Sequence, residues 1–97
     1  MNARVVILQV KSGKTGEVAR IFRDSIIPAA KEQKGFKGGT LLTDSNTNKA
    51  ISISLWDGRT DMIAGESSSY YQEQIAKISP LLEGEPIREH YEVSAQG

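Results

Sequence analysis

Apolar and polar positions along the chain follow two different periods. Residues 4–10 carry aliphatic side chains at odd and even positions alike, which predicts a strand covered on both faces. Residues 50–56 alternate strictly, with isoleucine and leucine on one face and serine and tryptophan on the other. The turn-forming residues 44–49 join this strand to residues 40–43 and predict a β-hairpin. A last strand is predicted over about residues 86–94.

A long amphipathic helix is predicted between the first strand and the hairpin. Apolar side chains recur at helical spacing from about residue 16 to residue 34, and Thr15 is a suitable N-cap. Pro28 lies inside this segment, and it predicts a kink or a change of helical pitch. Gly35 is expected to end the helix, and residues 36–39 are expected to form a glycine-rich connection.

A second helical region follows the hairpin. A short helix is expected from about residue 60, and a new start at Ser69, which has the capping-box pattern with Gln72. The segment order is therefore strand, helix, strand, strand, helix, strand. This order predicts an α+β fold, a ferredoxin-like βαββαβ sandwich with a four-stranded antiparallel sheet.

The open face of this sheet predicts an oligomer. Two helices cover one face, whereas the first strand is apolar on both. A second copy of the chain is the simplest cover for the other face. With 97 residues there is room for a single domain, residues 1–97. We therefore predict a single-domain homodimer.

Composition restricts the classes of function. Twelve Lys and Arg balance twelve Asp and Glu without a long run of either sign, which argues against nucleic-acid binding. The absence of cysteine excludes disulfides, thiolate nucleophiles and iron–sulfur ligation, and the single histidine cannot build a histidine metal cluster. No nucleotide-binding motif and no segment of membrane-span length is present. We expect a cytoplasmic protein without cofactor, metal, membrane or nucleic-acid partner.

The last strand carries a candidate for proton transfer. Arg88, His90 and Glu92 alternate along one face, which brings a cation, a base and an acid into one row. A histidine beside a carboxylate can carry a proton near neutral pH. The alternative is a solvated or interface-facing ladder of charges. Strand parity does not decide which face of the sheet this row occupies.

Aromatic residues provide candidates for a ligand cavity. Trp56 ends its strand on the face that carries Ser54, where it could form a cavity wall or cover the sheet edge. Tyr70 and Tyr71 are neighbours and point about 100° apart on a helix. Tyr71 belongs to the apolar stripe, so Tyr70 is the better candidate for a hydroxyl group that points into a cavity. Phe22 belongs to the apolar stripe of the first helix.

Several segments together resemble a known family over nearly the whole chain. They are Val5-Val6-Ile7-Leu8, the helix over 14–30, Gly35-Phe36 with Gly38, Ser54-Leu55-Trp56, Ser67-Ser68-Ser69-Tyr70-Tyr71 and Tyr91-Glu92-Val93. In this combination the sequence resembles the antibiotic-biosynthesis-monooxygenase-like group of dimeric α/β-barrel proteins. The resemblance implies that the sheets of two subunits pack into a barrel, with a cavity in each subunit between its own sheet and helices.

The resemblance also implies cofactor-independent oxygenation of an electron-rich phenol or hydroquinone. Trp56 matches the strand-end tryptophan of the family, whereas Gly65 stands where the family often has His or Trp. The asparagine that haem-degrading relatives use on the first strand has no counterpart among residues 5–8. These two differences argue against haem degradation.

We therefore predict a cofactor-independent monooxygenase-like protein that acts on a small aromatic, phenolic or quinol-type substrate. His90 would carry the proton, Arg88 would stabilise an enolate or phenolate oxygen, and Tyr70 would contribute its hydroxyl group. The residues expected to line the substrate cavity are Trp56, Tyr71, Phe22 and Ser54. Two alternatives remain: a non-catalytic dimer that binds a small apolar ligand or serves as a scaffold, and an isomerase with a single general base.

Overall fold

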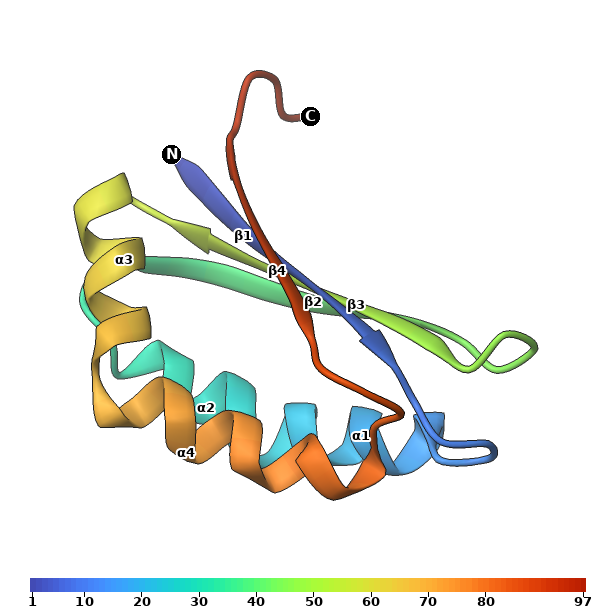
Figure 1. Cartoon of the computed structure of the whole chain (residues 1–97). Helices are drawn as coiled ribbons and strands as arrows, with labels where there is room; N and C mark the ends of the chain where they lie inside the picture. Colours follow the sequence, from blue (N-terminus) through green and yellow to red (C-terminus); the bar gives the residue numbers. More distant parts are fainter.

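A four-stranded antiparallel sheet with helices on one face makes up the chain in a computed structural model, which describes residues 1–97 (Figure 1). The strands are β1 (Asn2–Gln9), β2 (Phe36–Asp44), β3 (Lys49–Trp56) and β4 (Ile87–Glu92), in the spatial order β2-β3-β1-β4. The predicted fold class and strand order along the chain are confirmed. No helix is long and apolar enough to cross a membrane.

The first helical region changes pitch ahead of its proline, as predicted. It consists of α1 (Thr15–Ile21), a π-helical segment (Phe22–Ile26) and α2 (Ile27–Lys31). Pro28 has no N–H group to donate to the preceding turn, and the wider π turn lies directly before it. The helix ends at Lys31, three residues before the predicted end, and Lys14 rather than Thr15 is its N-cap.

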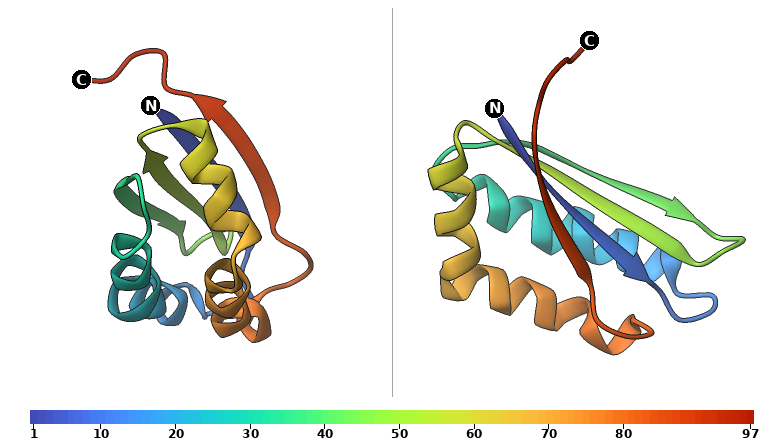
Figure 2. Two further views of the ribbon diagram at one scale, coloured as in Figure 1. Left: turned by 90° about the vertical axis from the view of Figure 1, so that its left-hand side faces the viewer. Right: turned by 45° about the horizontal axis from the view of Figure 1, so that its top comes forward.

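The second helical region is interrupted at the serines, as predicted. Helix α3 (Arg59–Ser67) stands at one end of the sheet, and α4 (Ser69–Ile78) runs beneath the sheet beside the first helical region (Figure 2). The predicted capping box is wrong, because Ser68 is the N-cap and makes no side-chain cap bond to α4. Its hydroxyl group donates instead to the carbonyl oxygen of Gly65, at 2.8 Å. A 3₁₀ turn (Ser79–Leu81) follows α4.

Strand β2 begins earlier than the sequence indicated. The predicted connection at 36–39 is strand, with a register shift between Phe36 and Gly38. The sequence did not indicate a strand here because glycines mark loops more often than strands. Phe36 packs edge-on against Trp56, with ring centroids 5.4 Å apart, and this contact holds the start of β2 to the end of β3.

The two faces of the sheet have different surroundings. On the inner face Val6 and Leu8 of β1 join Val18, Phe22 and Ile78 of the helices in the hydrophobic core. On the outer face one apolar side chain from each strand stands in a single row across the sheet, and no helix covers this row. The row consists of Leu42, Ile51, Ile7 and Ile87, of which Leu42 is 50% and Ile87 57% exposed.

Candidate active site

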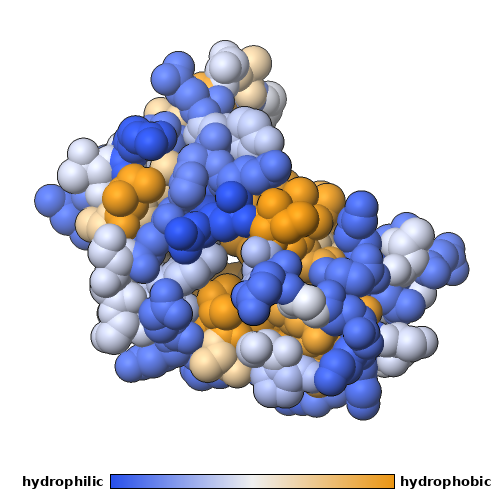
Figure 3. Space-filling view, in the orientation of Figure 1, coloured by the Kyte–Doolittle hydropathy of each residue, from blue (hydrophilic) through white to orange (hydrophobic).

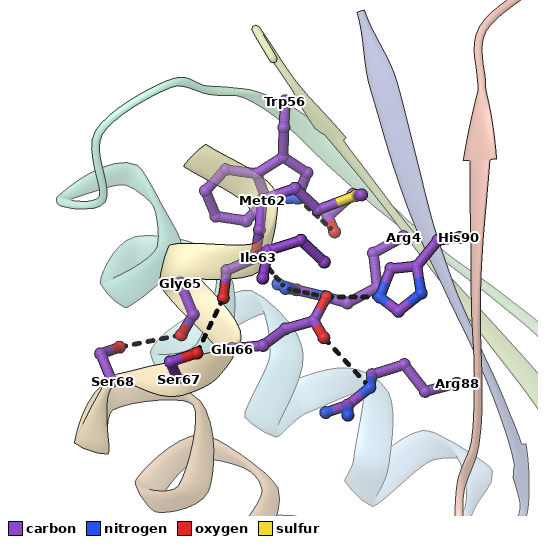
Figure 4. Close-up of polar contacts among 11 residues, drawn as sticks. Arg4, Trp56, Met62, Ile63, Gly65, Glu66, Ser67, Ser68, Arg88 and His90 are labelled. Carbon is purple, nitrogen blue, oxygen red and sulfur yellow. Dashed lines mark hydrogen bonds and ion pairs between the residues drawn. The ribbon is translucent and has the colours of Figure 1, made fainter. Parts of the chain in front are cut away.

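A buried carboxylate, Glu66, gathers three basic side chains at the inner face of the sheet. Helix α3 directs it toward β1 and β4, where its side chain is only 7% exposed (Figure 4). Its Oε2 atom lies 2.6 Å from Nε2 of His90 and 3.2 Å from Nη1 of Arg4. Its Oε1 atom lies 3.2 Å from Nε of Arg88. Arg4 and His90 are direct partners across the β1–β4 ladder, so both point to the same face.

The predicted row on β4 therefore faces the helices, with a different acid from the one expected. His90 and Arg88 both contact Glu66, while Glu92 is exposed and forms no ion pair. The register of β1 and β4 fixes this orientation, because Arg88 pairs with the buried Val6. A carboxylate that bonds one ring nitrogen of a histidine fixes the tautomer and leaves the other nitrogen for chemistry.

Arg4 is the most deeply buried charged residue of the site. It is 4% exposed, and its guanidinium group lies 5.0 Å from the ring centroid of Trp56 and 4.8 Å from that of Tyr71. Its Nη1 atom donates to the carbonyl oxygen of Met62 and to Glu66, while Nε and Nη2 have no protein partner. Two guanidinium groups face one carboxylate here, so the site favours an anionic oxygen.

Two small cavities lie between the sheet and the helices. The first, of about 50 Å³, is lined by Arg4, Phe36 and Ser54 among others, and the second, of about 40 Å³, by Gln74, Tyr71 and Leu8 among others. Four side chains border both: Phe22, Ile26, Ser52 and Tyr70. A cavity of about 150 Å³ is known to admit benzene, so these two spaces fit water but no aromatic ring until the side chains between them move.

An open groove of about 290 Å³ lies where β4 diverges from α4 (Figure 3). It is lined by Tyr71, Ile75, Pro86 and Arg88. Tyr71 and Ile75 also line the second cavity, so these two side chains form the wall between the groove and the interior. The guanidinium group of Arg88 lies 5.3 Å from the Tyr71 ring centroid at this wall.

The structure places the other predicted cavity residues as follows. Tyr70 and Phe22 border both cavities, Ser54 the first and Tyr71 the second. Burial raises the pKa of Tyr70 above its ordinary value, so its hydroxyl group stays protonated at neutral pH. Trp56 borders neither cavity: it is fully buried beneath Arg4, and its Nε1 atom donates to Ser54 at 2.9 Å.

The absence of a side chain at position 65 is explained by the neighbouring Trp56. A Cβ atom at this position would lie 3.4 Å from Cη2 of Trp56. The indole ring thus occupies the space into which a histidine or tryptophan side chain at residue 65 would extend. Glycine at this turn of α3 lets the helix approach the tryptophan, which brings the next residue, Glu66, to Arg4.

Sequence reasoning missed Glu66, Arg4 and Gln74. A weak signal existed for Arg4, because it shares the strand face of Val6 and Leu8 and a charge in such a strand needs a partner. Glu66 and Gln74 resemble ordinary polar residues of exposed helix faces, and no spacing distinguishes them. No group of three or more His, Asp or Glu side chains is arranged to hold a metal ion.

Comparison with solved structures shows the class of fold. The chain has the fold of the antibiotic biosynthesis monooxygenase-like proteins, which confirms the resemblance at the level of the fold. No protein-family model matches the sequence, and no curated protein sequence matches it.

Three of the similar structures differ in what is known of their function. A presumed antibiotic biosynthesis monooxygenase from Bordetella bronchiseptica has a TM-score of 0.84, 14% identity and coverage of 97% of each chain. SnoaB, a cofactor-independent oxygenase from Streptomyces nogalater, has a TM-score of 0.79 and 14% identity over 98% of this chain and 94% of its own. A protein of unknown function from Nitrosomonas europaea has a TM-score of 0.79 and 19% identity over 99% of this chain and 91% of its own.

Proposed function

We propose that the chain is a cofactor-independent monooxygenase-like protein that acts on a small aromatic, phenolic or quinol-type substrate. The observation that carries this proposal is the pair of His90 and the buried Glu66, 2.6 Å apart and next to two guanidinium groups. This arrangement supplies a base with a fixed tautomer and a positive environment for the anion that the base produces. The fold shared with SnoaB supports the same kind of chemistry.

In the proposed reaction a phenol binds beside Arg4, and His90, which borders neither cavity nor the groove in the present arrangement of side chains, takes its proton once the site opens. The guanidinium groups of Arg4 and Arg88 stabilise the phenolate. Deprotonation makes the ring electron-rich, so the phenolate can pass one electron to dioxygen. This transfer gives a phenoxyl radical and superoxide. The protonated hydroxyl group of Tyr70, which borders both cavities, can donate to the developing oxygen anion.

The remaining steps balance without another reagent. The radical and superoxide combine at a ring carbon that carries hydrogen, and His90 returns its proton to the terminal oxygen of the peroxide. Loss of water, with the hydrogen of that ring carbon, leaves a quinone. The phenol thereby gains one oxygen atom and loses two hydrogens, and the second atom of dioxygen leaves in the water.

We also propose that the working form is a homodimer. The apolar row on the outer face needs a cover, and a second copy offers a face of the same chemistry. Exposure of half or more of Leu42, Ile87 and Tyr91 supports this cover, because large apolar side chains gather there without a partner. The resemblance to the dimeric α/β-barrel group implies the same arrangement.

A second candidate function is binding of a small ligand without turnover. The observation that favours it is the size of the two cavities, about 50 and 40 Å³, which excludes an aromatic ring in the present arrangement of side chains. Under this alternative the ion cluster fixes the fold, and the open groove of about 290 Å³ between α4 and β4 receives the ligand.

Oxygen uptake separates the two functions. Purified protein would be incubated with a panel of hydroquinones and polycyclic phenols, without added metal or flavin, under air and under nitrogen. We expect product only under air, at least about tenfold less of it with His90→Gln, and full activity with the control Glu92→Gln. No product under air, with a melting temperature raised by the same compounds, would replace the oxygenase with the binding protein.

A further inference from the structure

The two interior cavities contain polar groups that the protein itself does not satisfy. In the first cavity, Nε and Nη2 of Arg4 donate no hydrogen bond within the protein, although these two atoms are not fully enclosed. In the second, Gln74 is 8% exposed and its Oε1 atom is buried without any partner. Each cavity therefore has one polar side chain with free hydrogen-bonding capacity: a cationic donor in the first, and in the second an amide acceptor that is buried and unpaired.

The unpaired Oε1 atom of Gln74 is unusual for a buried position. More than nine in ten buried polar groups in proteins have a hydrogen-bond partner, because an unpaired one loses its hydration without compensation. An aliphatic residue at position 74 would pack against Leu8, Ile75 and Ile78 without that loss. The glutamine thus has a cost for folding that a bound ligand could offset.

We infer that Arg4 and Gln74 are the specificity-determining residues of the interior site and that they bind the two ends of one ligand. Arg4 binds an anionic oxygen, and the Oε1 atom of Gln74 accepts a hydrogen bond from a hydroxyl or N–H group at the opposite end. The ligand class is then a small aromatic ring with an acidic oxygen and, across the ring, a hydrogen-bond donor. This inference rests on the proposed function for the aromatic ring and for taking the interior as the substrate site.

The cavities are arranged for such a ligand. They share Phe22, Ile26, Ser52 and Tyr70 as neighbours, so a rotation of the Phe22 and Tyr70 side chains would join them into one elongated space. Arg4 borders only the first cavity and Gln74 only the second, so a ligand in the joined space would meet Arg4 in one part and Gln74 in the other. Phe22 opens the π-helical segment, a kind of irregularity that frequently marks functional sites.

Titration calorimetry with three matched probes tests both ends. para-Hydroxybenzoate carries the anion and the donor, para-methylbenzoate replaces the donor by a group of similar size, and para-hydroxybenzamide replaces the anion by a neutral group. We expect para-hydroxybenzoate to bind at least about tenfold more tightly than either analogue, because para-methylbenzoate leaves Oε1 of Gln74 unpaired and para-hydroxybenzamide lacks the charge that Arg4 attracts. The anion end is tested on the ligand, since removal of Arg4 would leave the buried Glu66 with fewer partners.

Variants at position 74 test whether Gln74 is the residue that binds the hydroxyl group of the ligand. With Gln74→Leu or Gln74→Met we expect equal affinity for para-hydroxybenzoate and para-methylbenzoate and a melting temperature above that of the unmodified protein. The control Gln72→Leu, at an exposed position of the same helix, should keep the preference and the melting temperature. Two independent aliphatic variants guard against one of them failing to fold.

The outcomes separate this inference from the proposed function. Failure of para-hydroxybenzoate to bind, or a preference for the hydroxyl group that survives in both Gln74 variants, would overturn the inference even if oxygen-dependent turnover is found. Loss of that preference in both variants supports the inference even if no phenol is oxygenated, in which case the oxygenase proposal alone fails.

Discussion

Nε2 of His90 and Oε2 of Glu66 lie 2.6 Å apart although the two residues come from different layers of the fold, strand β4 and helix α3. The same carboxylate oxygen also accepts the Nη1 hydrogen bond of Arg4 from the neighbouring strand. One oxygen atom thus connects the histidine to the buried arginine. The pairing of the arginine, the orientation of the histidine and the contact of α3 with the sheet all involve this carboxylate.

Removal of that carboxylate should be strongly destabilising. Glu66→Ala leaves Arg4 buried without its anion, and the loss of one partner of a buried ion pair costs about 3–5 kcal/mol. Urea unfolding would measure this loss. The control Glu73→Ala, at an exposed position of α4, should stay within about 0.5 kcal/mol of the unmodified protein. A loss below about 1 kcal/mol for Glu66→Ala would mean that the carboxylate does not hold the cluster together.

Gly35 should tolerate no side chain. Its φ of +82° is unfavourable for other residues, and a Cβ atom there would lie 2.7 Å from Cβ of Asp61 in the first turn of α3. Gly13 has a similar φ of +75°, but a Cβ atom there would meet no atom beyond its chain neighbours within 4 Å, so Gly13→Ala costs only the backbone strain, about 1–2 kcal/mol. Gly35→Ala should cost measurably more by thermal or chemical unfolding. Equal costs for the two variants would show that α3 shifts freely.

Tyr70 should make the folded state sensitive to alkaline pH. Burial raises its folded-state pKa above the ordinary value of 10.0, so its contribution to stability is complete below pH 10 and is lost as the pH rises toward the folded-state pKa. Tyr70→Phe should flatten the fall of stability above about pH 10 in urea unfolding at a series of pH values.

Tyr91 provides the matched control for that experiment. Its pKa is raised mainly by the hydrogen bond of its hydroxyl group to the Glu89 carboxylate, but it lies at the surface, where salt and water weaken such effects. Tyr91→Phe should therefore leave the alkaline fall nearly unchanged at high salt. An identical pH profile for Tyr70→Phe and the unmodified protein would contradict burial of the Tyr70 hydroxyl group.

A charge in the centre of the outer apolar row should separate the proposed dimer. Ile51→Lys places an ammonium group between Ile7 and Leu42 on the open face, where it stays hydrated in a monomer but would be buried in a dimer. Sedimentation should show a monomer with an unchanged far-ultraviolet circular dichroism spectrum. The control Thr43→Lys lies at an exposed position near the same end of the hairpin and should remain a dimer. A monomeric unmodified protein would contradict the proposal.

The order of elements could be predicted because each has its own local signal. The alternation in residues 50–56 indicates a strand, although its isoleucine and leucine face is the open face of the sheet. The helical stripe that begins with Val18 and Phe22 marks the buried face of the first helical region, and Pro28 indicated the change of pitch. The start of β2 could not be predicted, since glycine has no side chain to show a period. Phe36 is strand because it packs on Trp56, and that contact spans twenty residues of sequence.

The site was predictable only in part for a related reason. Parity along β4 put Arg88 and His90 on one face, but the face is decided by pairing with β1, where Val6 stands opposite Arg88. The acid that His90 meets comes from α3 rather than from its own strand, and nothing local to Glu66 indicates burial. An ion cluster built from three elements has no signature in any one of them.

Strand β4 lies at the edge of the sheet, so the positions of His90 and Arg88 depend on the hydrogen bonds between β4 and β1 alone. This strand pairs only with β1, so a local opening of the edge would detach His90 and Arg88 together and admit water to Glu66, while β1 stays paired with β3. The last strand in chain order thus completes both the sheet and the charge cluster. The proton transfer proposed for His90 therefore depends on the pairing of this edge strand with β1.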